Sequence, residues 1–215
     1  MVTTPVSAQD LFRAAYENRY TWDSAFPGYT ATVTYRNGDR TVSGKVTVSA
    51  DLKPSVEGVT DEADVKAIHG QLFEVAIHRV RRSFEQTHGQ NSFRYGEVRP
   101  DGSQEILLGG KAEGDRYEVR DNEVTMVHRH IHGVVVTIHT ESSHQTGQGY
   151  LSHRYDSVYA DPATGEQKGG RNQFEDEYEP VGDYWLLKRR AIHTELDGAV
   201  SEQEFSFSDF ALLSA

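Results

Sequence analysis

The stretch that decides the fold is residues 123–139, which read EVTMVHRHIHGVVVTIH. As one long strand, this stretch would mix apolar and polar side chains on the same face. As a hairpin that turns at His132-Gly133, it separates them, because directly paired residues project from the same face of a sheet. The predicted pairs are Ile131 with Val134, His130 with Val135, His128 with Thr137, and Met126 with His139. The sequence therefore favours an antiparallel hairpin with histidines gathered on one face.

Alternation with a period of two continues on both sides of this hairpin. Residues 29–35 and 42–48 alternate around Asn37-Gly38, a pair that accepts the positive φ values of a type I′ turn. Further turns are predicted at Asp101-Gly102, Asp197-Gly198, 161–165 and 181–183. Between these turns we expect about eleven or twelve strands, most of them in the second half of the chain.

Two segments have helical periodicity instead, residues 7–20 and 61–87. The first opens with Ser7-Ala8-Gln9-Asp10, which is a capping-box pattern. Thr60 is the predicted N-cap of the second, and acidic residues follow it where the helix dipole favours negative charge. Its predicted buried stripe consists of Val65, Ile68, Leu72, Ala76, Val80 and Phe84, widened by Phe73 and Ile77. We therefore expect one short and one long helix beside the strands.

These elements predict a single α+β domain over residues 1–215 that is mostly antiparallel β. Its order is the helix 7–20, strands in 28–58, the long helix 61–87 and an antiparallel meander over 91–212. A sheet this long must curl or close to manage its edges, and two helices are too few to cover both of its faces. The predicted architecture is a curled or half-open β-barrel with the long helix against its concave side.

Composition excludes several classes of protein. The chain has no cysteine, so disulfides and thiolate sites are ruled out, and its net charge of -11 argues against a duplex nucleic-acid binder. No apolar run approaches the roughly 20 residues that a membrane-spanning helix needs, although peripheral membrane contact stays open. The start, residues 1–5, has neither the basic nor the apolar region of a secretory signal. We expect a cytoplasmic protein, or one in the plastid stroma.

The histidine face is the candidate metal site. Residues i and i+2 on a strand lie about 6.6 Å apart and point the same way, so a His-x-His pair can converge on one ion. The candidate ligands are His128, His130, His139, Glu141 and His153, a donor set that suits zinc or another divalent metal. Two alternatives stay open: solvated or structural histidines, and a patch that responds to pH. No cofactor is otherwise indicated.

Aromatic residues near the first helix form the candidate ligand-binding set. They are Tyr16, Tyr20 and Trp22, joined by Tyr155 from the later strand 150–159. Such side chains could line the mouth of a pocket, and the alternative is that they pack in the core.

Four stretches carry a family resemblance. They are residues 10–22 (DLFRAAYENRYTW), 78–85 (HRVRRSFE), 127–133 (VHRHIHG) and 149–159 (GYLSHRYDSVY). They resemble an uncharacterised domain-of-unknown-function family of cyanobacteria and plastids, over nearly the whole chain. The resemblance implies an oxygenic phototroph as the source and a cytosolic or thylakoid-adjacent setting, and it supplies no catalytic residues. The predicted layout is also similar to the lipoprotein-carrier fold, which by itself licenses no function.

Three functions are compatible with these observations. The first is a non-catalytic protein that holds a hydrophobic small molecule or a segment of a partner protein in a concave sheet. The second is a metal-dependent enzyme built on the His-x-His strand. The third is a surface-acting assembly factor of a photosynthetic organism. No complete catalytic set is recognisable, so the sequence favours a binding role over an enzyme.

Overall fold

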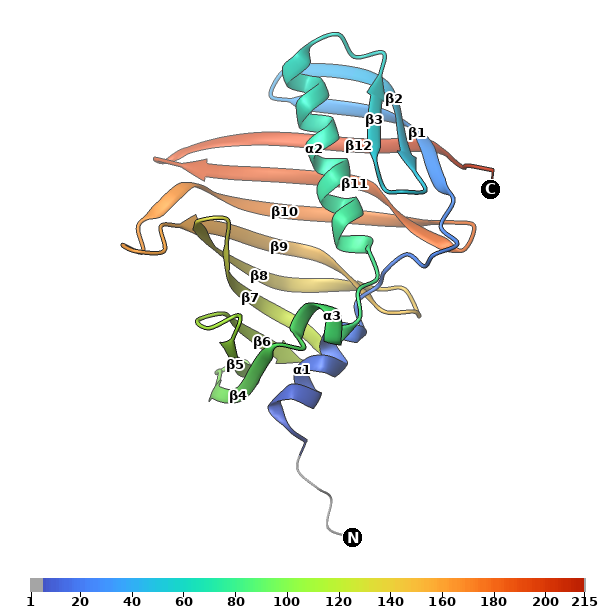
Figure 1. Ribbon diagram of the computed structural model, residues 1–215. Helices are drawn as coiled ribbons and strands as arrows, with labels where there is room; N and C mark the ends of the chain where they lie inside the picture. Colours follow the sequence, from blue (N-terminus) through green and yellow to red (C-terminus); the bar gives the residue numbers. More distant parts are fainter. Residues whose placement is uncertain (1–5, 215) are drawn as a thin grey trace. The chain divides into compact units, whose positions relative to one another are not determined.

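The computed structural model describes residues 6–214, which contain three helices and twelve strands (Figure 1). The helices are α1 (Ala8–Glu17), α2 (Glu62–Arg79) and α3 (Phe84–His88). The strands are β1 (Gly28–Asn37), β2 (Arg40–Ser49), β3 (Pro54–Glu57), β4 (Asn91–Val98), β5 (Gln104–Gly110), β6 (Arg116–Arg120), β7 (Glu123–Ile131), β8 (Val134–Gln145), β9 (Tyr150–Ala160), β10 (Gln167–Val181), β11 (Tyr184–Leu196) and β12 (Ala199–Leu212). None of the helices among residues 6–214 is long and apolar enough to span a membrane.

The chain forms two compact units. The first unit consists of the residues up to Tyr20 together with Arg82–Asn172, and the second of Thr21–Arg81 together with the residues from Gln173 onward. The strand order is β4-β5-β6-β7-β8-β9-β10 in the first unit and β3-β2-β1-β12-β11-β10 in the second, because β10 runs from one unit into the other. The sheet is antiparallel, as predicted, but neither order of described strands closes on itself. A barrel is therefore not formed by these pairings, and the single domain stays a prediction.

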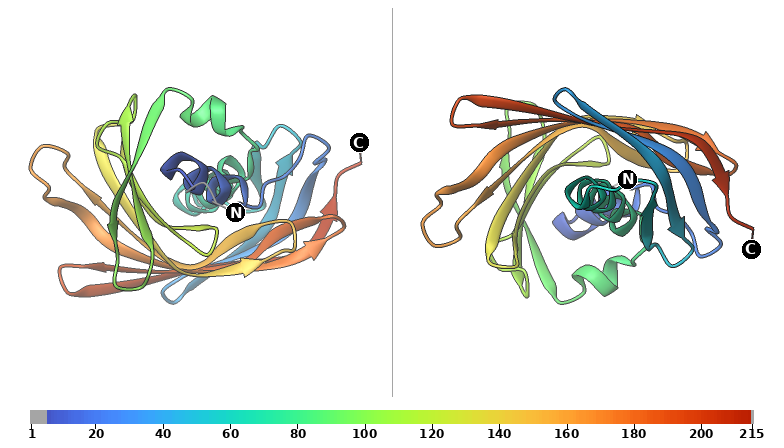
Figure 2. Two further views of the ribbon diagram at one scale, coloured as in Figure 1. Left: turned by 90° about the horizontal axis from the view of Figure 1, so that it is seen from below. Right: turned by 90° about the horizontal axis from the view of Figure 1, so that it is seen from above.

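The first unit is built around α1. Its helix begins at Ser7, whose side chain accepts a hydrogen bond from the Asp10 backbone, as the capping pattern predicts. The strands of this unit bend around the helix (Figure 2). Phe12 is fully buried, and its ring centre lies 4.5 Å from that of Tyr117 on β6. The buried core cluster consists of Ala8, Phe12, Ala15, Tyr16, Phe84, Ile106, Leu108, Tyr117 and Val119.

The second unit is a sheet face covered by α2. This helix runs across β12 and β11 (Figure 1). The alternating residues of β1 are buried, and directly paired residues of β2 and β12 continue the same apolar face. The members of this face on the three strands are Tyr29, Ala31, Val33, Tyr35, Val46, Val48, Phe205 and Phe207. The buried apolar residues of α2 are Ile68, Leu72, Val75 and Ala76.

The predicted single helix over residues 61–87 is wrong. Val80 has extended backbone (φ -64°, ψ 124°), so α2 ends at Arg79. A separate short helix, α3, begins after Ser83, where Ser83 and Gln86 form a reciprocal capping box. The predicted N-cap at Thr60 is also off by one, because Asp61 caps α2 through bonds from the two backbone N–H groups of Ala63 and Asp64.

Two further details of the helices differ from the sequence prediction. Phe73 and Ile77 of α2 are not buried: 49% and 37% of their surface is exposed. The first helix is also shorter than residues 7–20, because it ends at the C-cap Asn18 and the following residues pair with Tyr150 instead. In both cases the part of the helix that makes tertiary contacts is smaller than the periodicity alone suggests.

The predicted turns are present, one of them shifted by a residue. Asn37 pairs with Arg40, so the turn residues are Gly38 and Asp39 instead of Asn37-Gly38. Only Gly38 of these has positive φ (57°), which is the pattern of a turn with glycine first. At Asp197-Gly198 both residues have positive φ, as the type I′ expectation requires.

Candidate functional site

The histidine-bearing hairpin formed by β7 and β8 has the predicted register. Ile131 pairs with Val134, and the turn residues His132 and Gly133 have φ of 49° and 80°. The remaining pairs are His130 with Val135, Arg129 with Val136, His128 with Thr137, Val127 with Ile138, and Met126 with His139. The histidine face is less polar than expected, because Met126 and Val135 are buried on it.

His128 and His130 are the closest pair of imidazoles on this face. Their ring centres are 6.0 Å apart and their planes are nearly perpendicular, at 85°. The Nδ1 of His128 is hydrogen-bonded to Thr137 Oγ1 across the hairpin, at 2.8 Å. The Nδ1 of His130 lies 3.1 Å from Oδ1 of Asp115, and the His130 backbone N–H donates to the same oxygen at 2.9 Å. Both rings are thus fixed through Nδ1.

The surroundings of these two rings favour the neutral imidazole at His128. Partial burial lowers the pKa of His128 below its ordinary value, and the nearby charges of Arg116 and His130 lower it further. Arg116 on β6 is the direct strand partner of His128. Asp115, in contrast, is a buried carboxylate that holds His130 from the loop before β6.

His139 is engaged elsewhere. Its Nδ1 lies 3.4 Å from Oδ1 of Asp156, its direct partner on β9. Asp156 is buried and accepts a second bond from Arg171, at 2.6 Å. The ring of His139 is therefore oriented towards β9, on the side away from β7 in the strand order.

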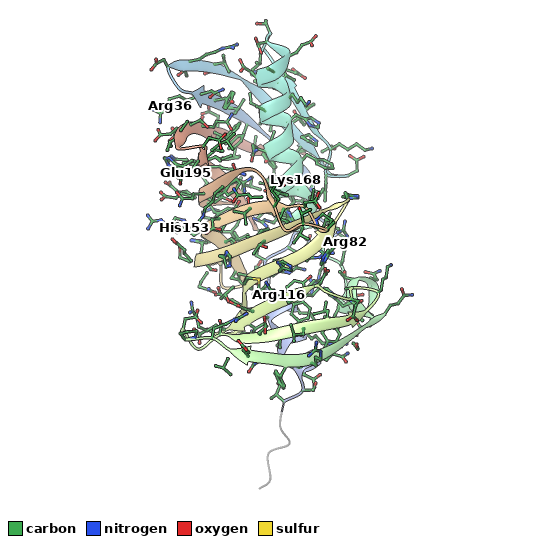
Figure 3. The ribbon with its side chains drawn as sticks, turned by 90° about the vertical axis from the view of Figure 1, so that its left-hand side faces the viewer. Arg36, Arg82, Arg116, His153, Lys168 and Glu195 are labelled. Atoms are coloured by element: carbon green, nitrogen blue, oxygen red, sulfur yellow. The ribbon has the colours of Figure 1, made fainter. Side chains whose placement is uncertain are left out.

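The last two predicted ligands are also not gathered with His128. Glu141 lies in a bulge, because Thr140 and Ser142 pair with successive partners on β9 and Glu141 has none. His153 is on β9, five residues from the position in register with His128, or about 17 Å along the strand. Figure 3 shows His153 well separated from Arg116, the strand partner of His128.

The five predicted ligands therefore do not form one metal centre. Among residues 6–214, no group of three or more His, Cys, Asp or Glu side chains is placed to hold a metal ion. The physical cause is the register of β9 together with the bulge in β8, which sequence alternation alone does not reveal.

The predicted aromatic ligand set is mostly buried. Tyr16 is 8% exposed in the core of the first unit, where its hydroxyl bonds to Thr87. Tyr20 is 2% exposed, and Trp22, in the second unit, stacks on Phe26 with ring centres 4.0 Å apart. Tyr155 is half-buried on β9. This burial matches the core-packing alternative, and ligand binding by these residues stays a prediction.

A buried ion pair beneath α2, formed by Arg190 and Asp176, was not predicted from the sequence. Arg190 on β11 and Asp176 on β10 are 3% and 1% exposed. The guanidinium donates to both carboxylate oxygens, at 2.8 and 2.6 Å, which is the bidentate geometry of strong pairs. Its remaining nitrogen donates to Gln71 Oε1 at 2.8 Å and to Glu74 Oε1 at 3.4 Å, both on α2. The pair therefore ties the helix to the sheet.

Polar contacts also hold the two ends of α2. Near its start, Arg40 on β2 bridges to Asp61 at 3.2 Å and to the buried Asp64 at 2.6 Å. At its end, Arg79 donates to the hydroxyl of Tyr178 at 3.4 Å. Burial raises the pKa of that Tyr178 hydroxyl, so it stays protonated. The helix is thus anchored at its start, middle and end.

Comparison with known families places the chain. The model of a family described as protein of unknown function (DUF3386) matches residues 3–213. The chain belongs to the DUF3386 family. The resemblance drawn from its sequence to a domain of unknown function is thereby confirmed, whereas a cyanobacterial or plastid source for this DUF3386 chain stays a prediction. Among curated proteins, no relative matches it.

Several solved structures are similar to this DUF3386 chain. A LolA superfamily protein from Nitrosomonas europaea has 10% identity and a TM-score of 0.39, over 98% of this chain and 96% of its own. A putative outer membrane lipoprotein-sorting protein domain from Vibrio parahaemolyticus has 10% identity and a TM-score of 0.38, over 96% and 92%. A DUF1329 family protein from Desulfovibrio piger has 9% identity and a TM-score of 0.28, over 99% and 96%.

Proposed function

We propose that this protein is a non-catalytic binding protein for a hydrophobic molecule, or for an apolar segment of a partner protein. The binding surface is the apolar sheet face of the second unit that α2 covers. The observation that carries the proposal is the way α2 is held there. Polar contacts anchor the helix at three points, while Phe73 and Ile77 on the same helix are exposed.

The energetics of α2 support a removable cover. The three larger buried apolar side chains of the helix, Ile68, Leu72 and Val75, each contribute about 1.5–3 kcal/mol to docking. The hydrogen bond from the charged Arg190 to Gln71 adds about 1.5–3 kcal/mol net, because water replaces it on opening. Lifting the helix would expose a broad aromatic and aliphatic face on β1, β2 and β12. A long apolar chain can replace the helix on that face.

The exposed pair on α2 supplies a second apolar contact. Phe73 and Ile77 are four residues apart and therefore lie one above the other on one helix face. Exposed large apolar side chains grouped in this way mark surfaces that bind an apolar partner. A ligand or peptide held beneath or beside α2 could contact them without burying a new charge.

The experiment is a titration of the tag-free full chain with a fluorescent long-chain fatty acid. We expect saturable binding and, in the Q71A/E74A double variant, binding at least threefold tighter, because α2 loses its two bonds from Arg190. K66A, an exposed change on the same helix, is the matched control and should leave the affinity unchanged. Hydrogen exchange of α2 amides verifies that the double variant loosens the helix. Absence of binding in a variant whose helix is shown to be loosened would overturn the proposal.

A further inference from the structure

Two imidazoles on one face of β7, those of His128 and His130, are oriented in the way that metal-binding histidines are. His128 and His130 project from the same face, two residues apart, and His130 is exposed. Each ring has its Nδ1 occupied, by Thr137 Oγ1 and by the Asp115 carboxylate. A carboxylate accepts, so Nδ1 of His130 carries the hydrogen, and Nε2 is the nitrogen left to bind an ion. This is the second-shell arrangement that orients imidazoles in metal sites.

We propose that His128 and His130 form a two-histidine chelate for a divalent transition metal ion such as Zn(II), Ni(II) or Cu(II), bound through both Nε2 atoms. Water completes the coordination shell, and Asp115 and Thr137 orient the ligands. The site takes two protein ligands, and His139, Glu141 and His153 are outside it. It is independent of the hydrophobic binding proposed for the second unit.

The ring geometry fits one shared ion. With metal–nitrogen bonds of about 2.0–2.1 Å and each Nε2 about 1.1 Å from its ring centre, two rings reach one ion when their centres are within about 6.4 Å. The observed separation is 6.0 Å. A tetrahedral angle at the ion needs centres about 5.2 Å apart, so the two ring centres must approach each other by under about 1 Å when the ion binds.

The backbone around His130 limits where its ring can go. A side chain at Gly114 would place its Cβ only 3.2 Å from Cε1 of His130, and Gly114 has a φ of 90°. The imidazole therefore packs directly over this glycine. Together with the two contacts to Asp115, this packing reduces the ring's freedom in the absence of metal, which lowers the entropy cost of binding.

Charge at the site acts in both directions. The protein carries a net charge of -11, and Asp115 lies directly behind His130, which both favour a cation. Arg116, the direct partner of His128, opposes it. The balance gives the proposal two further variants: R116Q removes the opposing charge, and D115N removes the orienting one.

The test is isothermal titration calorimetry of the tag-free full chain with ZnCl2 or NiSO4 alone. We expect one saturable ion per chain, weakened at least tenfold in both H128A and H130A, weakened severalfold in D115N and strengthened severalfold in R116Q. H139A is the matched control, because it removes an exposed histidine of the same hairpin face, and it should change the affinity less than twofold. Circular dichroism checks that each variant is folded.

A second measurement on the unaltered protein keeps the proposal testable if a variant unfolds. Added Ni(II) should broaden NMR signals of residues 114–116, 127–131 and 136–138 before any others. Binding that is unaffected by H128A and H130A, broadening centred elsewhere, or no saturable binding would each overturn the site. Equal loss in H139A would replace the two-histidine chelate with a three-histidine one and so reject it as stated.

Discussion

The two units of this protein solve the same packing problem in different ways. The first surrounds α1 with a dry aromatic cluster in which Phe12 contacts four other rings within about 6 Å of its own, among them Tyr117 and Phe93. Its one buried imidazole, His88, is held by an amide of Asn91. The second unit places a charged pair, Arg190 on β11 and Asp176 on β10, beside the apolar face of β1, β2 and β12, and anchors α2 to this pair.

The contrast between the aromatic contacts of α1 and the partly polar contacts of α2 indicates that α2 is the helix that can move. A core made of interlocked rings loses its contacts steeply with separation, so displacing α1 would expose the whole cluster. Around α2, part of the holding energy comes from polar groups that water can satisfy equally well. For that reason we assign ligand access to α2 and a structural role to α1. Three sets of variants, at Asp176, at His88 and at Leu72 with Phe73, test this contrast.

The largest expected effect comes from Asp176. Replacing it with asparagine leaves the buried Arg190 without its ionic partner, and breaking such a pair costs about 3–5 kcal/mol. Its neighbour Glu177 on the same strand is the matched control, because it faces the other way and pairs with the more exposed Arg189 at 3.1 Å. E177Q should cost less than about 1 kcal/mol. Hydrogen exchange of second-unit amides measures both opening free energies.

The comparison also predicts how Asp176 can be rescued. The double variant D176L/R190M replaces the ion pair with apolar side chains, which should recover most of the stability lost in D176N. It should also loosen α2, because the bonds to Gln71 and Glu74 disappear with the guanidinium. If D176N and E177Q cost the same, the pair is not an energetic anchor and the contrast between the two units fails.

The histidine hairpin could be predicted from the sequence, whereas the buried pair of Arg190 and Asp176 could not. The histidine hairpin was predictable in full register, because Gly133 marks its turn and the alternation around it distinguishes two faces. The buried pair was not, because Glu175-Asp176-Glu177 reads as a solvated edge. Yet alternation places Arg190 on the same side as the buried Ile192, so one arginine of Arg189-Arg190 had to face inward.

The helix boundaries show the same limit. No proline or glycine stands directly before Val80, so the helical periodicity of the sequence continues past the observed end of α2 at Arg79. The capping box of Ser83 and Gln86 was present in the sequence and marks the start of α3. The division into two units left no sign in composition: one boundary falls inside the strand β10, and the other two fall in the short connections between α1 and β1 and between α2 and α3. Non-local strand register, which also separated the predicted metal ligands, has no local signature.

The next effect tests the first unit through pH. Burial lowers the pKa of His88 from 6.5 to about 4, with the charges of Arg129 and Arg19 contributing. The folded state thus resists a proton that the unfolded chain accepts. Stability is full above pH 6.5 and falls as the pH drops towards 4, by about 3 kcal/mol from this group. Urea unfolding followed in the first unit at pH 7, 5.5 and 4.5 measures the loss.

A variant separates His88 from the carboxylates that titrate in the same range. H88Q keeps an acceptor for Asn91 but has no proton to gain, so its unfolding free energy should be lower at pH 7 and less dependent on pH. The difference in slope between the two proteins is the contribution of His88. Parallel slopes would mean that the pKa of His88 is the same in the folded and unfolded states, which burial among aromatic rings does not favour.

The smallest expected effect comes from Phe73 on α2, and the adjacent Leu72 is its buried comparison. Leu72 is 2% exposed and Phe73 is 49% exposed. L72A should cost about 2–5 kcal/mol, as buried leucines do, whereas F73A should change the unfolding free energy by less than about 0.5 kcal/mol, since alanine also favours the helix. Fatty-acid binding should weaken in F73A even though the unfolding free energy stays the same. A neutral effect on both measurements would leave α2 as a cover with no part in ligand contact, and a large loss of stability would mean that Phe73 packs against the sheet face after all.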